Sequence, residues 1–162
     1  MNKIIGFRIR AIVASALTGV LLLSNSASAA DPFTLNFPAG VACEFALQVD
    51  GTGGNSHTKV FKNGVMLTAG TGSALTFTNL SSADTLSLKS NGFSSTVTIN
   101  PDGTQTIVST GNFVVVLFPT DTPAGPSTTL WAGYSTATVD TLGNFHLGKT
   151  VSHSADICAA LS

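Results

Sequence analysis

The sequence predicts an all-β protein, namely an antiparallel β-sandwich of about nine or ten strands with a short C-terminal helical turn. A closed β-barrel is the alternative. Apolar and polar residues alternate with a period of two along most of residues 31–162, as expected of strands half-buried in a sheet. Turn signals recur about every eight to twelve residues. Ser and Thr, which suit strands and turns better than helices, supply 35 of these residues.

Residues 1–30 contain the three parts of a secretory signal peptide in the right order. Lys3, Arg8 and Arg10 give a positive start, residues 11–23 are an apolar run, and the small residues of 24–30 suit signal peptidase. The apolar run is shorter than the roughly eighteen residues expected of a membrane helix. We therefore expect a secreted, extracellular protein in which residues 31–162 form a single β-sandwich domain with no membrane span.

The charge of the mature chain argues against one class of partner. Without the signal peptide the chain keeps four lysines, no arginine and eight acidic residues, so its net charge is 4 − 8 = −4. Proteins that bind nucleic acid neutralise phosphates with clustered Lys and Arg. We therefore expect no nucleic-acid partner.

Several strands and turns can be placed along the first two thirds of the chain. The stretch VACEFALQVD, residues 41–50, predicts a strand with Cys43 on its inward face. The Asn63-Gly64 pair predicts a hairpin with a tight two-residue turn, since such turns need two residues with positive φ. Further turns are expected at Asn91-Gly92, at residues 100–103 and at residues 141–144. These connections are too short for crossover helices, so antiparallel pairing is expected.

Residues 113–118, FVVVLF, form a continuous apolar run, which is typical of a central strand covered on both faces. Two layers are therefore expected. A proline-rich loop over residues 119–127 follows, and then strands over residues 129–140 and 144–153. Ser154 is expected to cap one or two helical turns at the C-terminus.

Cys43 and Cys158 are the only cysteines, and they lie near the two ends of the mature chain. In an exported protein, an even number of cysteines favours a disulfide over a catalytic thiol or a metal site. We therefore expect a structural disulfide between Cys43 and Cys158 that clamps the C-terminal segment onto the first long strand.

The sequence gives little support to catalytic or metal chemistry. His146 and His153 are seven residues apart, so they would face opposite sides of a regular strand. Ser56 and Lys59 match the spacing of a Ser-x-x-Lys motif, but that motif starts a helix and this segment enters a strand. Glu44 is the only glutamate, which disfavours paired catalytic carboxylates. We therefore expect no metal, no cofactor and no catalytic residue.

The proline-rich loop and the aromatic residues after it are a candidate ligand surface. Prolines reduce the entropy lost on ordering a loop, and the only Trp and Tyr, Trp131 and Tyr134, follow it. In this interpretation one of the two rings stacks on a sugar or an apolar group while Asp121 hydrogen-bonds. Trp131 and Tyr134 are three residues apart and should face opposite sides of a strand. The alternative is a rigid crossover between sheets with Trp131 buried.

Five stretches, TGSALTFTNL, TLSLKSNG, NPDGTQT, LFPTDTPAGPSTTLWAG and DICAALS, together resemble an uncharacterised family of small secreted proteins of actinobacterial type. The resemblance covers essentially the whole mature chain. It implies export and a single all-β domain, and it brings no activity, cofactor or catalytic residue.

These observations predict a non-enzymatic, secreted domain with a binding or structural role, and an envelope glycan or a protein as its partner. A secreted hydrolase is the alternative, because an active site can be assembled from residues distant in sequence, here His57, His146 or His153 with Ser and Asp. A self-assembling envelope component is a third option, which exposed edge strands would favour.

Overall fold

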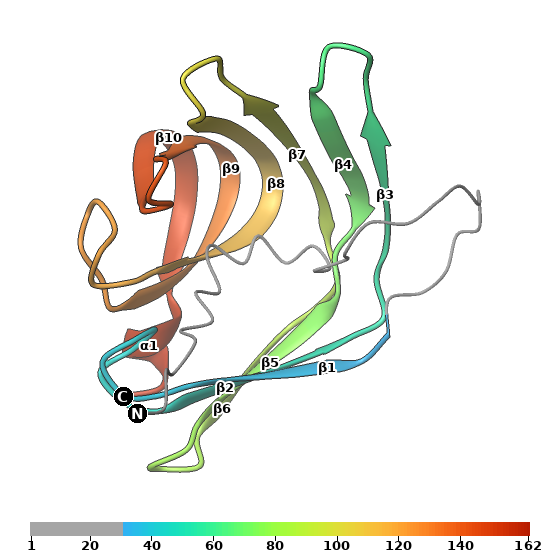
Figure 1. The fold of residues 1–162 in the computed structure, drawn as a ribbon. Coiled ribbons are helices and arrows are strands. Elements are labelled where there is room, and N and C mark those ends of the chain that lie inside the picture. Colours follow the sequence, from blue (N-terminus) through green and yellow to red (C-terminus); the bar gives the residue numbers. More distant parts are fainter. Residues whose placement is uncertain (1–30) are drawn as a thin grey trace, which may run out of the picture.

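A computed structural model describes residues 31–162, and the predicted signal peptide, residues 1–30, lies outside the described residues. The described chain forms two antiparallel sheets that do not close, followed by one short helix (Figure 1). The predicted β-sandwich is therefore confirmed, and the closed barrel is wrong. Within residues 31–162, no helix is long and apolar enough to cross a membrane.

The two sheets contain four and six strands, in the orders β1-β2-β5-β6 and β10-β9-β8-β7-β4-β3. The elements are β1 (Phe33–Phe37), β2 (Leu47–Thr52), β3 (Asn55–Val60), β4 (Met66–Thr71), β5 (Ala74–Asn79), β6 (Thr85–Leu88), β7 (Gly92–Ile99), β8 (Gln105–Leu117), β9 (Ser127–Val139), β10 (Phe145–Asp156) and α1 (Ile157–Ala160).

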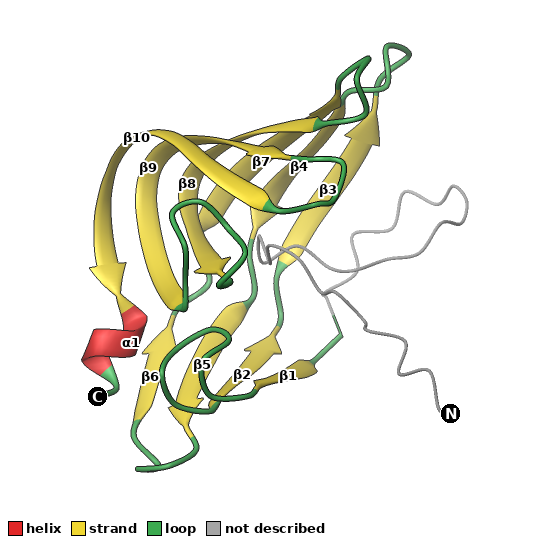
Figure 2. Cartoon of the chain, turned by 60° about the vertical axis from the view of Figure 1, so that its left-hand side comes forward, coloured by secondary structure: helices red, strands yellow, loops and turns green. Residues whose placement is uncertain are grey.

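The chain passes between the two sheets three times at one corner of the sandwich (Figure 2). β2 continues into β3 through Gly53-Gly54, β4 continues into β5 through Gly72-Ser73, and β6 continues into β7 through residues 89–91. Gly53 and Gly54 have φ of +66° and +95°, a region that glycine enters without steric cost. Bends of this kind let a strand leave one sheet and enter the other. The prediction of an ordinary turn at Asn91-Gly92 is therefore wrong, because this segment is one of the three crossings.

A row of glycines lets the six-stranded sheet curl. Gly70, Gly111 and Gly133 are aligned across β4, β8 and β9, with Phe93 of β7 between the first two. Their φ values lie between +90° and +145°. A Cβ atom on any of the three would collide with the backbone of the next strand. β8, β9 and β10 curve strongly (Figure 1), and four small polar side chains of this sheet are buried, namely Ser95, Ser109, Thr128 and Ser135.

Three hairpins of the six-stranded sheet end in the same turn. In each, a glycine with φ between +76° and +83° donates its backbone N–H to the carbonyl oxygen three residues earlier. This is a type I turn followed by a bulge glycine. The tight two-residue turn predicted for the first hairpin is wrong, because the loop is longer and only its glycine has positive φ. The glycines and their partners are Gly64 with Phe61, Gly103 with Asn100, and Gly143 with Asp140.

β8 confirms the prediction of a strand covered on both faces. Val114 and Val116 belong to the larger core cluster, which includes Leu47 and Phe77 of the four-stranded sheet. Phe113, Val115 and Leu117 project to the other side, into a second cluster. The other buried members of the second cluster are Ile107, Ala137 and Phe145.

The strand predicted over residues 41–50 begins only at Leu47. Residues 39–45 form turns and bends, and the N–H of Gly40, with φ of +78°, donates to the carbonyl oxygen of Cys43 over 2.8 Å. Cys43 is fully buried, as expected. It lies in a loop that packs on the core, however, and not on the inward face of a strand.

We predict that Gly111→Ala destabilises the oxidised protein by about 1–3 kcal/mol, the cost of a strained backbone position. The added Cβ would lie 2.9 Å from the Cα of Phe93 at a φ of +90°. Gly92→Ala is the matched control, since its Cβ would meet nothing closer than the Gly70 carbonyl oxygen at 4.0 Å. Denaturant unfolding should show a much smaller change for the control. Equal losses in both variants would contradict the role given to the glycine row.

Candidate functional site

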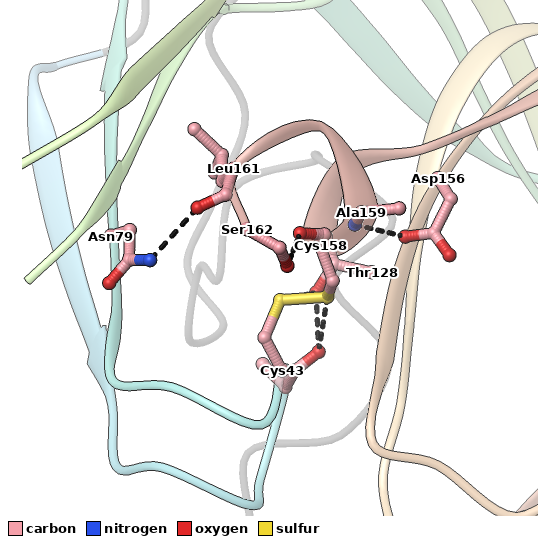
Figure 3. Close-up of a disulfide and its surroundings, with 9 residues drawn as sticks. Cys43, Asn79, Thr128, Asp156, Cys158, Ala159, Leu161 and Ser162 are labelled. Atoms are coloured by element: carbon pink, nitrogen blue, oxygen red, sulfur yellow. Dashed lines mark hydrogen bonds between the residues drawn. A yellow bond between two sulfur atoms is a disulfide. The ribbon is translucent and has the colours of Figure 1, made fainter. Parts of the chain in front are cut away.

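The predicted disulfide between Cys43 and Cys158 is present, with a Cα to Cα distance of 5.6 Å. Cys43 lies in the segment between β1 and β2, and Cys158 lies in α1 (Figure 3). The bond therefore ties a loop of the four-stranded sheet to the end of the last strand of the six-stranded sheet. A disulfide and the lack of a membrane-spanning helix in residues 31–162 are compatible with an extracellular protein.

The C-terminal residues around this bond are packed and hydrogen-bonded. Ile157 and Leu161 are almost fully buried. The amide nitrogen of Asn79 donates to the carbonyl oxygen of Leu161 over 2.9 Å (Figure 3). Beside the disulfide, the hydroxyl of Thr128 in β9 donates to the carbonyl oxygen of Ala42 over 2.9 Å, which ties the loop of Cys43 to the six-stranded sheet. The C-terminal segment is therefore held at several points besides the covalent bond.

The N-cap of α1 is Asp156, and the prediction of Ser154 is wrong. The carboxylate of Asp156 accepts a hydrogen bond from the backbone N–H of Ala159 over 3.0 Å. Ser154 lies inside β10, paired with Trp131. The strand continues two residues beyond Ser154 because β9 offers partners as far as Thr129.

Asp121 stabilises the proline-rich loop between β8 and β9. Its side chain is buried, and its two carboxylate oxygens accept the backbone N–H groups of Phe118, over 2.7 Å, and Phe145, over 2.9 Å. The N–H of Thr122 also donates to the carbonyl oxygen of Phe145. The loop is thereby fixed to the start of β10. It joins two neighbouring strands of the six-stranded sheet, and Trp131 is half-buried, so the alternative of a crossover between sheets with Trp131 buried is wrong.

Trp131 and Tyr134 face opposite sides of β9, as predicted from their spacing. Trp131 is opposite Phe113 of β8 and packs against the second core cluster. Tyr134 lies between Thr110 and Val151 and is 36% exposed. The structure does not bring these two rings together with the Asp121 carboxylate. Their role as a ligand surface stays a prediction.

The three histidines are dispersed over the six-stranded sheet. His57 lies on the exposed edge strand β3, whereas His146 and His153 lie on β10 at the other edge. A bulge between Leu147 and Thr150 changes the alternation of β10. His146 pairs with Thr138 and His153 with Ala132, so the two histidines lie on the same face of the sheet, contrary to the expectation for a regular strand. They are nevertheless far apart along β10. Residues 31–162 contain no group of three or more His, Cys, Asp or Glu side chains placed to hold a metal ion.

Asp140 is the carboxylate with the largest resolved change in pKa among the described residues. Desolvation raises its pKa, but hydrogen bonds outweigh this effect and lower the pKa to about 2. Its oxygens accept the side-chain and backbone N–H groups of Asn144 over 2.8 and 2.7 Å. The ring Nε2 of His146 lies 3.3 Å from Oδ2. This half-exposed network stabilises the turn between β9 and β10.

The sheet corner contains a cleft that the sequence analysis missed. It has a volume of about 80 Å³ and lies where the crossings from β4 to β5 and from β6 to β7 approach β8 and β9. Such a volume holds several water-sized groups. The residues that line it are polar (Ser73, Lys89, Asn91, Asn112), apolar (Leu75, Leu88, Phe93, Phe113, Val114, Leu130) and Gly72.

Hydrogen bonds fix the shape of this corner cleft. The N–H of Gly72 donates to the carbonyl oxygen of Asn91 over 2.9 Å, which joins two of the crossings. The hydroxyl of Ser73 donates to the carbonyl oxygen of Gly53 over 3.0 Å, which joins the third. By contrast, the half-buried amide of Asn112 and the exposed ammonium of Lys89 have no hydrogen-bond or ion-pair partner within residues 31–162. These two groups are therefore available to a ligand.

The sequence held a weak signal for the corner cleft. Gly, Ser and Asn are concentrated at 51–55, 70–73 and 90–92, which is typical of turns. Only the pairing of strands shows that these segments are crossings and that they meet. A second space, between β1, β2, β5 and β8, is lined by apolar residues alone and has a volume of about 20 Å³, the room of about one water molecule.

Comparison of the chain with models of protein families, with curated proteins and with solved structures gives no match. The resemblance to small secreted actinobacterial-type proteins stays a prediction.

We predict that replacing both cysteines, in the variant Cys43→Ser/Cys158→Ser, destabilises the protein by about 4–5 kcal/mol, because the bond closes a loop of over a hundred residues. A domain of this size is stable by only about 5–15 kcal/mol. The variant should therefore unfold at a much lower denaturant concentration than the oxidised protein. Reduction of the unmodified protein should have the same effect. Equal midpoints for the oxidised protein and the variant would contradict the prediction.

We predict that Asp140 makes stability depend on pH in the acid range. Its pKa in the folded state, about 2, lies below the ordinary value of 3.8, so its contribution is present above about pH 4 and is lost as pH falls through about 2. Asp140→Asn should lower the unfolding midpoint near neutral pH and approach the unmodified protein in strong acid. Asp84→Asn is the control, since no side chain or N–H of the described residues is bound to that carboxylate. A pH-independent difference for Asp140→Asn would refute the assignment.

Proposed function

We propose that the mature chain is a secreted, extracellular binding domain without catalytic activity, and that the corner cleft is its ligand site. The signal-like residues 1–30 and the Cys43–Cys158 disulfide support export to an oxidising compartment. The histidines favour a binding domain over the hydrolase alternative, which would gather a histidine with an aspartate and a serine in one cleft. His146 lies beside Asp140, but no serine hydroxyl is bonded to either side chain within residues 31–162, and no histidine lines the corner cleft.

The observation that carries the proposal is the mixed lining of the corner cleft. Ligand sites are typically concave and mostly apolar, with a few polar groups that fix orientation. Here the aromatic ring of Phe93, next to Gly72, occurs with the unpaired amide of Asn112. Aromatic faces combined with amide groups suit the apolar face and the hydroxyls of a sugar ring.

Lys89 adds the chemical class of the ligand. It is exposed, lines the cleft and has no carboxylate partner among the described residues. A cation beside an aromatic cleft favours an anionic substituent such as a carboxylate. An acidic envelope glycan, of which one sugar ring enters the cleft, is therefore the proposed ligand.

The test is a titration of the oxidised protein with an oligosaccharide of uronic acids and with an uncharged oligosaccharide of the same length. The acidic sugar should raise the unfolding temperature more than the uncharged one. Saturation at about a hundred times Kd would stabilise the fold by about 2.7 kcal/mol, which is several degrees.

Two variants and a matched control locate the site. Lys89→Gln should weaken binding of the acidic sugar by about tenfold, the effect of losing one charge-assisted hydrogen bond, and Asn112→Ala should weaken both sugars. Lys149→Gln removes a lysine of β10, at an edge of the six-stranded sheet, and should leave binding unchanged. No shift with either sugar, or equal losses in Lys89→Gln and Lys149→Gln, would overturn the proposal.

A further inference from the structure

The β3–β4 hairpin is the part of the described chain with the least tertiary support. All six residues of β3 are exposed, and β3 is the edge strand of the six-stranded sheet, paired only with β4. Figures 1 and 2 both show its tip at the end of the molecule away from α1. Edge strands of natural proteins are commonly protected by prolines, bulges or charges. β3 has neither proline nor bulge, and its protection consists of Lys59 and the neighbouring His57.

Exposed apolar side chains gather at this tip. Val60 is 63% exposed, Phe61 is 40% exposed, and Ile99 at the end of β7 is 61% exposed. The register pairs Val60 with Met66 and Met66 with Val97, so these three side chains share one face of the sheet, and Ile99 is the next residue on that face. Phe61 follows Val60 and lies beside Lys59, on the other face of the hairpin. The apolar residues of the hairpin tip and of the end of β7 are hereafter called the tip patch: Val60, Phe61, Met66, Val97, which also packs against the second core cluster, and Ile99.

The hairpin that carries the tip patch has positively charged side chains and no acidic ones. Residues 51–83 contain Lys59 and Lys62, half of the lysines of the mature chain, and no acidic residue, although the mature chain is acidic overall. Neither lysine forms an ion pair within residues 31–162. The ammonium of Lys59 lies 5.1 Å from the centre of the Phe61 ring. The neighbouring turn carries one carboxylate, Asp102, whose pKa is lowered by hydrogen bonds from Thr104, so the tip region has two lysines against one ionised carboxylate.

The exposed apolar side chains and the neighbouring lysines together indicate which partner covers this edge of the sheet. Pairing of β3 with β3 of a second copy would bring two lysine-bearing hairpins together, and lysine on an edge strand disfavours such edge-to-edge pairing. Exposed aromatic and aliphatic side chains flanked by lysines without ion-pair partners instead match an anionic lipid surface, where the Phe61 ring and the aliphatic side chains enter the headgroup region and the lysines meet the phosphates.

We propose that the tip of the β3–β4 hairpin, Lys59 to Lys62 with Ile99, docks the protein on the surface of an anionic lipid bilayer. Docking here is peripheral, because the hairpin buries only the side chains of the tip patch. This surface is separate from the corner cleft, so the two proposals stand or fall independently.

The experiment is co-sedimentation of the oxidised full mature protein with vesicles of phosphatidylcholine alone and with vesicles of equal parts phosphatidylcholine and phosphatidylglycerol. We expect binding to the anionic vesicles only, weakened by salt. Lys59→Gln and Lys62→Gln should each weaken it about fivefold, which corresponds to about 1 kcal/mol per lysine near an anionic surface. Phe61→Ser should weaken it further without changing the unfolding temperature, since this ring is exposed.

Lys149→Gln, which removes the same charge from β10, is the matched control and should bind as the unmodified protein does. Light scattering on the same samples measures self-association. The proposal would be overturned by lack of binding to anionic vesicles, by an equal loss in Lys149→Gln, or by a dimer in solution that Lys62→Gln strengthens and vesicles do not disperse.

Discussion

A strand that serves two sheets has to bend, and three segments of this chain bend at the same corner. The bends at Gly53-Gly54, Gly72-Ser73 and residues 89–91 make the two sheets parts of one continuous set of hairpins. The backbone groups freed at the bends are bound across the corner, as from Gly72 to Asn91. The corner thereby fixes where the sheets face each other, where a cleft remains, and where β3 and β4 extend beyond the four-stranded sheet.

The disulfide gives the sandwich a second link between its sheets. The crossings connect β2, β5 and β6 of the four-stranded sheet to the six-stranded sheet, but β8, β9 and β10 have no crossing of their own. Cys158, which follows β10, is bonded to Cys43 in the loop before β2. The bond therefore holds the second half of the six-stranded sheet to the four-stranded one. The core between them is built from Val114 and Val116 on one side and from residues such as Phe77 on the other.

The polar surface of this protein is made mainly of hydroxyl groups, so its few charges are informative. Most carboxylates lie at turns and strand ends, where Asp102, Asp121 and Asp140 accept backbone N–H groups. The lysines Lys59, Lys62 and Lys89 have no such partners within residues 31–162. Acidic residues thus stabilise the fold, whereas these unpaired lysines stand beside exposed or concave apolar surface. Both proposed sites combine such a lysine with apolar surface.

The sequence by itself determined the class of fold, the doubly covered strand and the disulfide. Alternation, turn residues and the run at residues 113–118 are local signals that report burial directly, and each of the only two cysteines has a single possible intramolecular partner. Local signals failed where the tertiary structure overrode them. Ser154 is a good capping residue, yet β9 extends the strand past it to Asp156, and Asn91-Gly92 is a good turn, yet it joins two sheets. The corner cleft and the tip patch were decided by tertiary structure alone, because each is made of residues from strands that the chain brings together by pairing across distant segments.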